Sequence, residues 1–434
     1  GTITGNRIVT LPVGVENFYV INNATSGAYT VQLKAASGSG ATVTWATTDK
    51  GWKFVYFDGV ATNTGVFDIN ADLSINDLTI RGNLTVDGGT IKLDGNYPTG
   101  TDNVALGNQA LEAVEAGGIQ NTAVGNQSLE NVTTGDNNIG VGHRTLCTLT
   151  TGSCNVAVGK DALRTNTASS NTAIGHEALV VNTTGCRNSS FGSLSLDANT
   201  EGDTNVAVGY QSLSANTTAD NNTAVGSFAL LANTTGTKNT SVGKSSLATN
   251  TTGDCNVALG VDALTSATTA SNNTAVGVSS LLSNTTGCRN TALGSCSLNA
   301  NTTGTNNVAS GFTSMLLNTE GSKNVAYGYA SLGSNTTGSC NTAIGCGSLG
   351  GNTTASDNTA VGFDSLKANT TGTTNVAVGV NSLVANTTGS ASVAIGCDAM
   401  CKTTTGGTSV AIGRSALCSN VTSSSNTAIG YQAL

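Results

Sequence analysis

Residues 222–238 read NTAVGSFALLANTTGTK, and variants of this 17-residue segment fill most of the chain. The glycine equivalent to Gly226 returns every 17 residues from Gly175 to Gly430. Earlier steps are also 17, except for 18 residues before Gly125 and 16 before Gly175. Twenty copies occupy residues 103–434. Such a period predicts a repeat protein in which each coil packs on its neighbours.

Each copy starts with an alternation that predicts a short β-strand. The residue two before the glycine is small, and the residues three and one before it are wider, as in Thr223-Ala224-Val225. Four residues after the glycine stands Leu in 18 of 20 copies and Met in the other two, which is typical of a packed position. We expect a strand, a glycine turn, a second short strand and a polar Asn-Thr-Thr-Gly turn. The expected structural core of the repeat is Gly226, Leu230, Val225, Asn222, Gly243 and Leu247.

This pattern predicts an all-β fold, an elongated trimeric parallel β-roll or β-solenoid of 17-residue coils with a small β domain before it. A single-chain left-handed β-helix is the structural alternative, but that fold repeats an apolar position about every six residues. Here the apolar positions before and after the glycine are five apart, and the rest of the coil is polar. The core of one chain then looks thin on one side, which favours sharing between chains.

The residues before the repeats divide into two segments. Residues 1–66 are rich in aromatic residues, which lie in short alternating runs and predict a β-sandwich-like attachment domain of antiparallel strands with the aromatics mainly in its core. Residues 67–102 alternate apolar and polar residues but are too few for a core of their own, so we expect a β shaft that joins identical chains. Residues 103–434 form the solenoid.

Composition argues against several functional classes. The net charge of −8 disfavours a nucleic acid partner, and no apolar run is long enough for membrane insertion. The sequence has no recognisable catalytic motif, metal-ligand spacing or cofactor motif, so we expect no enzyme, no metal and no cofactor. His143 and His176 are expected to be exposed. Aspartates recur two after the glycine, and a glycosidase pair among them is a minor alternative: Asp161, Asp262, Asp364 and Asp398.

Eleven cysteines lie at variable positions of the coil, and their odd number at scattered positions suggests free thiols. Cys401 and Cys418 occupy the same position of neighbouring coils and can come close. We expect two stacked free thiols there, with a disulfide or a metal site as the alternative.

Two surface features are candidates for binding. Threonines eight and nine after the glycine form ranks along the rod, but adjacent residues point in opposite directions, so ice binding is a minor alternative. The two positions after the glycine vary freely and carry aromatic residues that can contact a receptor or cover a seam between chains: Tyr210, Phe228, Phe312, Tyr329, Phe363 and Tyr431.

The motif Asn-Thr-Ala-Val-Gly…Ala-Leu…Asn-Thr-Thr-Gly over residues 103–434 resembles repeats of bacteriophage tail fibres. It is also similar to the shorter head repeats of trimeric autotransporter adhesins, which are parallel β-rolls built from three chains. Residues 9–12, residues 48–52 and the shaft residues 84–88 look like virion proteins of T4-like marine phages, cyanophages in particular. Such fibres often carry a C-terminal chaperone that is cleaved off. The resemblance therefore implies that further sequence continued past Leu434 or was removed.

Together these features predict a homotrimeric tail fibre of a virion, assembled in the host cytoplasm and extracellular when mature. Its partners would be other virion or fibre proteins on the N-terminal side and a glycan or protein of the host surface. A bacterial trimeric surface adhesin is the first alternative, which a signal peptide or membrane anchor in the full gene would favour. A polysaccharide-degrading fibre is another, which release of oligosaccharide would favour.

Overall fold

The computed structural model describes residues 1–12, 16–36, 39–48, 50–58, 66–68, 100–115 and 117–434. The chain divides into two compact units, residues 1–91 and 92–434. The elements in the described residues are all strands, and none of these residues forms a helix long and apolar enough to cross a membrane. Most of the expected shaft, residues 69–99, lies outside the described residues.

The N-terminal unit contains two three-stranded sheets. One sheet is β1 (Arg7–Leu11), β3 (Val31–Ala35) and β4 (Val43–Trp45), and the other is β2 (Glu16–Asn23), β5 (Gly51–Asp58) and β6 (Val66–Asp68). The sheets run antiparallel except for β1 and β3, which pair in parallel, so the antiparallel expectation is wrong for that pair.

Only part of the aromatic content of this unit is buried. Trp45 and Phe57 lie in a core with Leu33 and Val55. In contrast, Phe18, Trp52 and Phe54 are 68%, 65% and 51% exposed on the outer face of β2 and β5. The expectation that the aromatics are mainly core residues therefore holds for only some of them.

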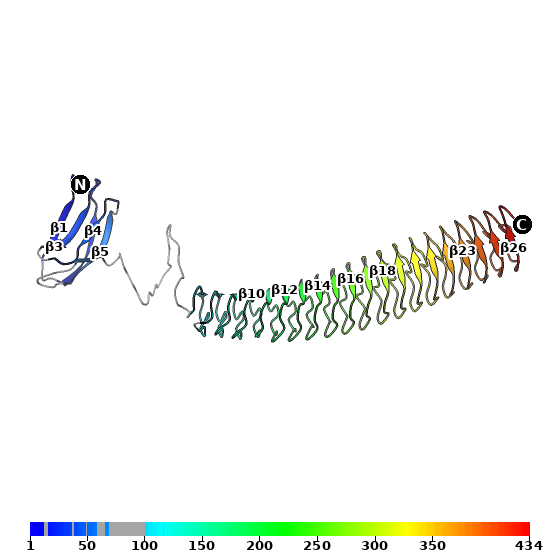
Figure 1. Ribbon diagram of the computed structural model, residues 1–434, viewed down its shortest axis with the longest axis horizontal. Coiled ribbons are helices and arrows are strands. Elements are labelled where there is room, and N and C mark those ends of the chain that lie inside the picture. The colour runs from blue at the N-terminus through cyan, green and yellow to red at the C-terminus, as the bar shows by residue number, and fades with distance from the viewer. Residues whose placement is uncertain (13–15, 37–38, 49, 59–65, 69–99, 116) are drawn as a thin grey trace. The chain divides into compact units, whose positions relative to one another are not determined.

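The second unit is a β-solenoid, in which each coil contributes one three-residue strand to a single parallel row (Figure 1). The row runs in sequence order, and every strand pairs in register with the next, so that Ala224 faces Ala207 and Ser241. The strands are β7 (Val104–Leu106), β8 (Thr122–Val124), β9 (Ile139–Val141), β10 (Val156–Val158), β11 (Thr172–Ile174), β12 (Ser189–Phe191), β13 (Val206–Val208), β14 (Thr223–Val225), β15 (Thr240–Val242), β16 (Val257–Leu259), β17 (Thr274–Val276), β18 (Thr291–Leu293), β19 (Val308–Ser310), β20 (Val325–Tyr327), β21 (Thr342–Ile344), β22 (Thr359–Val361), β23 (Val376–Val378), β24 (Val393–Ile395), β25 (Val410–Ile412) and β26 (Thr427–Ile429).

The second strand expected after the glycine is absent from the coils. Phe228 and Leu230 both adopt left-handed backbone angles, with φ of 62° and 51°, and such angles interrupt an extended strand. Hydrogen bonds between coils continue through this turn, for example from Leu230 N to Ser246 O at 3.1 Å. Left-handed leucines cost energy, but Leu230 is fully buried, so packing offsets that cost.

Small and large apolar side chains stack in the core. The small residue of each strand and the leucine four after the glycine form one continuous cluster, represented by Ala224 and Leu230. Leu247 occupies the equivalent place in the next coil. Val225 instead points to the outer face of the sheet and is only half-buried, so within one chain it lies outside this core.

Two ladders of buried asparagines lie in the interior beside this apolar cluster. Asn239 illustrates the first ladder: its backbone N–H donates to Asn222 Oδ1 at 2.9 Å, its side chain donates to Gly253 O at 2.8 Å, and its Oδ1 accepts from Asn256 N at 3.0 Å. In the second ladder, the Asn250 side chain donates to Asn233 Oδ1 at 2.8 Å and also to Gly253 O at 3.0 Å. These amides form hydrogen bonds with backbone groups that the coil buries. The polar side of the coil, which offers few apolar residues, is therefore packed by asparagines within a single chain.

The repeat glycine is required by close packing between coils. Gly226 has a φ of 133°, and a Cβ atom there would lie 2.6 Å from the carbonyl oxygen of Gly243. Any side chain would therefore push neighbouring coils apart.

Candidate binding surfaces of the solenoid

The outer sheet face consists of the side chains three and one before each repeat glycine. The inner position between them is buried, so these two columns face away from the core. Twelve residues of the column nearest the glycine are large, apolar and at least 36% exposed: Leu106, Val141, Ile174, Phe191, Val208, Leu259, Leu293, Tyr327, Ile344, Ile395, Ile412 and Ile429. Every residue of this column is apolar or aromatic except Ser310, and we call the column the apolar strip.

The six aromatic candidates form two close pairs and two isolated members. Tyr210 and Phe228 meet edge to face, with ring centroids 5.5 Å apart, and Phe312 stacks on Tyr329 at 6.0 Å. Phe363 and Tyr431 lie on other coils and are 52% and 66% exposed. Phe228 is therefore half-buried, whereas the other five candidates are exposed.

A hollow of about 770 Å³ opens beside Tyr329 and Phe363. Gly347, Gly350 and Gly351 line it, together with residues from the coils on either side. The two rings belong to the candidates predicted from sequence, whereas the three glycines do not. The signal was present, because glycine occurs at these three positions of the coil where almost all other copies have a side chain.

The recurrent aspartates are not arranged as a catalytic pair. No two of the four stand on neighbouring coils. Asp364 forms an ion pair with Lys367 at 2.9 Å, and Asp398 accepts a hydrogen bond from Asn381 at 3.2 Å. Within one chain, none of the four aspartates therefore has another of the four on a neighbouring coil.

Asp161 lies in a cluster of cations. Its side chain is buried, with Arg144 Nε 2.9 Å from Oδ1, Lys160 Nζ 3.3 Å from Oδ2 and Arg164 Nη1 3.9 Å from Oδ1. Burial alone raises the pKa of Asp161, but the hydrogen bonds and charges of Arg144 and Lys160 outweigh it and hold the pKa below its usual value. Such a carboxylate ties neighbouring coils together and stays ionised.

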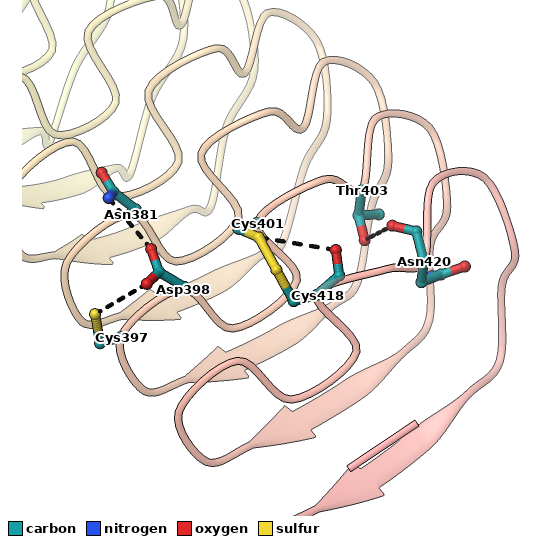
Figure 2. The surroundings of a disulfide bond; sticks show 7 residues. All are labelled: Asn381, Cys397, Asp398, Cys401, Thr403, Cys418 and Asn420. Atoms are coloured by element: carbon teal, nitrogen blue, oxygen red, sulfur yellow. Dashed lines mark hydrogen bonds between the residues drawn. A yellow bond between two sulfur atoms is a disulfide. The ribbon is translucent and has the colours of Figure 1, made fainter. Parts of the chain in front are cut away.

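The cysteines differ from expectation at one place. Cys401 and Cys418 form a disulfide between neighbouring coils, with Cα atoms 5.0 Å apart, instead of two free thiols (Figure 2). The other nine are free. Burial and a hydrogen bond to Glu130 raise the pKa of Cys147 to about 11, so this thiol is not activated as a nucleophile.

Both histidines are exposed, as expected, and Nε2 of His176 lies 3.5 Å from Oε1 of Glu177. Among the residues that the structure describes, no group of three or more histidine, cysteine or acidic side chains is placed to hold a metal ion.

Comparisons with protein-family models, with curated proteins and with solved structures found no match for this chain.

Proposed function

We propose that this chain is the subunit of a homotrimeric bacteriophage tail fibre. The N-terminal domain attaches it towards the virion or a neighbouring fibre protein, and the solenoid reaches or adheres to the host surface. Its work is mechanical and adhesive rather than catalytic. The fibre assembles in the host cytoplasm and acts outside the cell as part of the virion.

The apolar strip on the outer sheet face is the observation that carries this proposal. At about 4.8 Å per coil, twenty coils make this strip about 95 Å long. A contiguous exposed apolar surface of that length is unusual for a monomer and typical of a surface that a partner covers. Three identical strips around one axis would cover each other along the whole rod, and this matches the three-chain β-rolls that the repeat resembles.

The exposed aromatic residues of the N-terminal unit support its attachment role. Phe18 and Tyr56 pair across β2 and β5 with ring centroids 4.8 Å apart, and Trp52 lies further along the same face. A sheet face with large exposed rings is suited to a protein interface, where such side chains contribute most of the binding energy.

Fibre function follows from the rod itself. Backbone hydrogen bonds between successive coils, joined in most coils by asparagine side chains, make each coil depend on its neighbours, so the solenoid resists bending at any single point. Three chains also present three copies of any surface site, which raises avidity for a host surface.

Immunogold electron microscopy of phage particles tests this assignment. Antibodies against the solenoid should label thin fibres attached to the tails of intact particles. Label on the envelope of uninfected bacteria would overturn the proposal and favour a cellular adhesin. Release of oligosaccharide from host envelopes by the purified chain would favour a degrading fibre.

A further inference from the structure

The coil that begins at Gly345 departs from the repeat at three surface positions. It has Gly347 two after the repeat glycine, Gly350 five after and Gly351 six after. No other coil has a glycine at the positions two or six residues after the repeat glycine. At the position five residues after it, the one other glycine is Gly333, in the preceding coil. Two adjacent coils have thus lost side chains on one side, and this loss makes the hollow of about 770 Å³.

The missing side chain at Gly347 admits a carboxylate. A Cβ atom at Gly347 would lie 2.2 Å from Asp364 Oδ1, so the carboxylate occupies the space that a side chain fills in other coils. The other oxygen, Oδ2, accepts from Lys367 Nζ at 2.9 Å. The Asp364 side chain is only 16% exposed, whereas Lys367 is 54% exposed, so the pair presents acceptor and donor atoms at the hollow.

Aromatic rings from the coils before and after the glycine-rich coil line the hollow. Tyr329 belongs to the coil before it and Phe363 to the coil after it, and both line the hollow. They lie two coils apart, which is about 10 Å at about 4.8 Å per coil. Phe312 stacks on Tyr329 with ring planes 15° apart, which supports the first ring from outside the hollow.

We propose that this hollow binds a neutral oligosaccharide of hexopyranose units. A pyranose ring has a flat C–H face that packs on aromatic rings and a rim of hydroxyls that both donate and accept hydrogen bonds. The hollow offers both kinds of contact, and its size is that of a small-ligand site. Because Asp364 and Lys367 neutralise each other, the site has no excess charge to favour an anionic ligand.

This inference names the ligand class for the adhesive role proposed above and rests on that role, but its test does not need the virion. Purified full-length chain is titrated with a panel of neutral glucose, galactose and mannose oligosaccharides by isothermal calorimetry and saturation-transfer NMR. We expect binding by at least one series, with contacts from the aromatic residues.

Variants locate the site. Gly350→Leu restores a side chain that other coils carry at this position, such as Leu316, and should abolish binding by filling the hollow. Phe363→Ala should weaken binding about tenfold through loss of ring packing. Val278→Ala shortens an exposed side chain at the same position of a distant coil, one residue after the repeat glycine, and should leave affinity unchanged. Thermal unfolding checks that each variant still folds.

Two results would overturn the inference: no binding by any member of the panel, or binding that survives Gly350→Leu in the folded variant. Capture of aliphatic detergent by the hollow in place of sugars would also contradict it. Sugar binding by a chain absent from phage tails would leave the site standing and refute the fibre. Labelled tail fibres without sugar binding would refute only the site.

Discussion

At Gly236 one carbonyl oxygen accepts hydrogen bonds from two asparagine side chains, Asn222 at 2.8 Å and Asn233 at 2.9 Å. The two asparagine columns therefore meet at the same buried turn of every regular coil. A buried amide contributes stability because the groups it pairs would otherwise lose water without compensation. This arrangement explains why asparagine recurs where an apolar residue would be expected in a solenoid core.

Asn222→Ala is predicted to destabilise the solenoid by about 1–3 kcal/mol, because the buried N–H of Asn239 loses its acceptor. Asn222→Ser is the matched control, since Ser409 fills this position naturally and its hydroxyl accepts from Asn426 N at 3.1 Å. Urea unfolding and hydrogen exchange at Asn239 measure both changes. Equal stability of the alanine and serine variants would refute the ladder's role.

Asp161 is predicted to make stability depend on acid. Its pKa is lowered in the folded chain, so its contribution is present above the ordinary value of 3.8 and is lost as the pH falls through the lower folded value. Thermal unfolding at a series of pH values should show Asp161→Asn less stable than the natural chain at neutral pH. The difference should shrink in strong acid, and a constant difference would contradict the pairing with Arg144 and Lys160.

At the scale of one coil, the strand and the packed leucine could be predicted from sequence, and the turn between them could not. The alternation around Ala224 indicates an extended segment because its period is two. The left-handed angles of Phe228 and Leu230 have no such signature, since neither residue type favours them. Asn222 was expected in the core and is buried there, but the ladder through Asn233 was not expected. Asn-Thr-Thr-Gly has turn composition, and composition does not say which way the Asn233 side chain points.

The hollow shows the same limit for the candidate site. Tyr329 and Phe363 could be selected as exposed aromatics from their variable position. Their enclosure depends on Gly347 and Gly350, whose effect appears only when coils are stacked in register.

The disulfide is predicted to hold the last coils together. Cross-linking residues 17 apart stabilises a chain by about 3 kcal/mol in the loop-entropy account. Cys418→Ser, or reduction of the natural chain, should speed hydrogen exchange in the coils around Cys401 and leave the middle of the solenoid unchanged. Cys346→Ser, at an exposed free thiol, is the control. Unchanged exchange near Cys401 after reduction would show that the bond is dispensable.

At the scale of the whole molecule, the outer sheet face decides whether one chain is the functional unit. Ile344→Asp with Ile395→Asp places two charges on the apolar strip, where an interface would bury them unpaired at a large cost. We predict that this double variant stays a folded monomer. Thr252→Asp, on an exposed polar turn, should assemble as the natural chain does. Light scattering with circular dichroism separates assembly from folding, and a double variant that assembles normally would remove the strip from the interface.

The mass of the intact particle in solution tests the central claim most directly. Light scattering and native mass spectrometry of the purified chain should give three times the chain mass of 43.0 kDa. A stable particle of one chain mass would contradict the trimeric fibre. It would mean that the solenoid, with its core closed by its own asparagines, works as a self-contained rod.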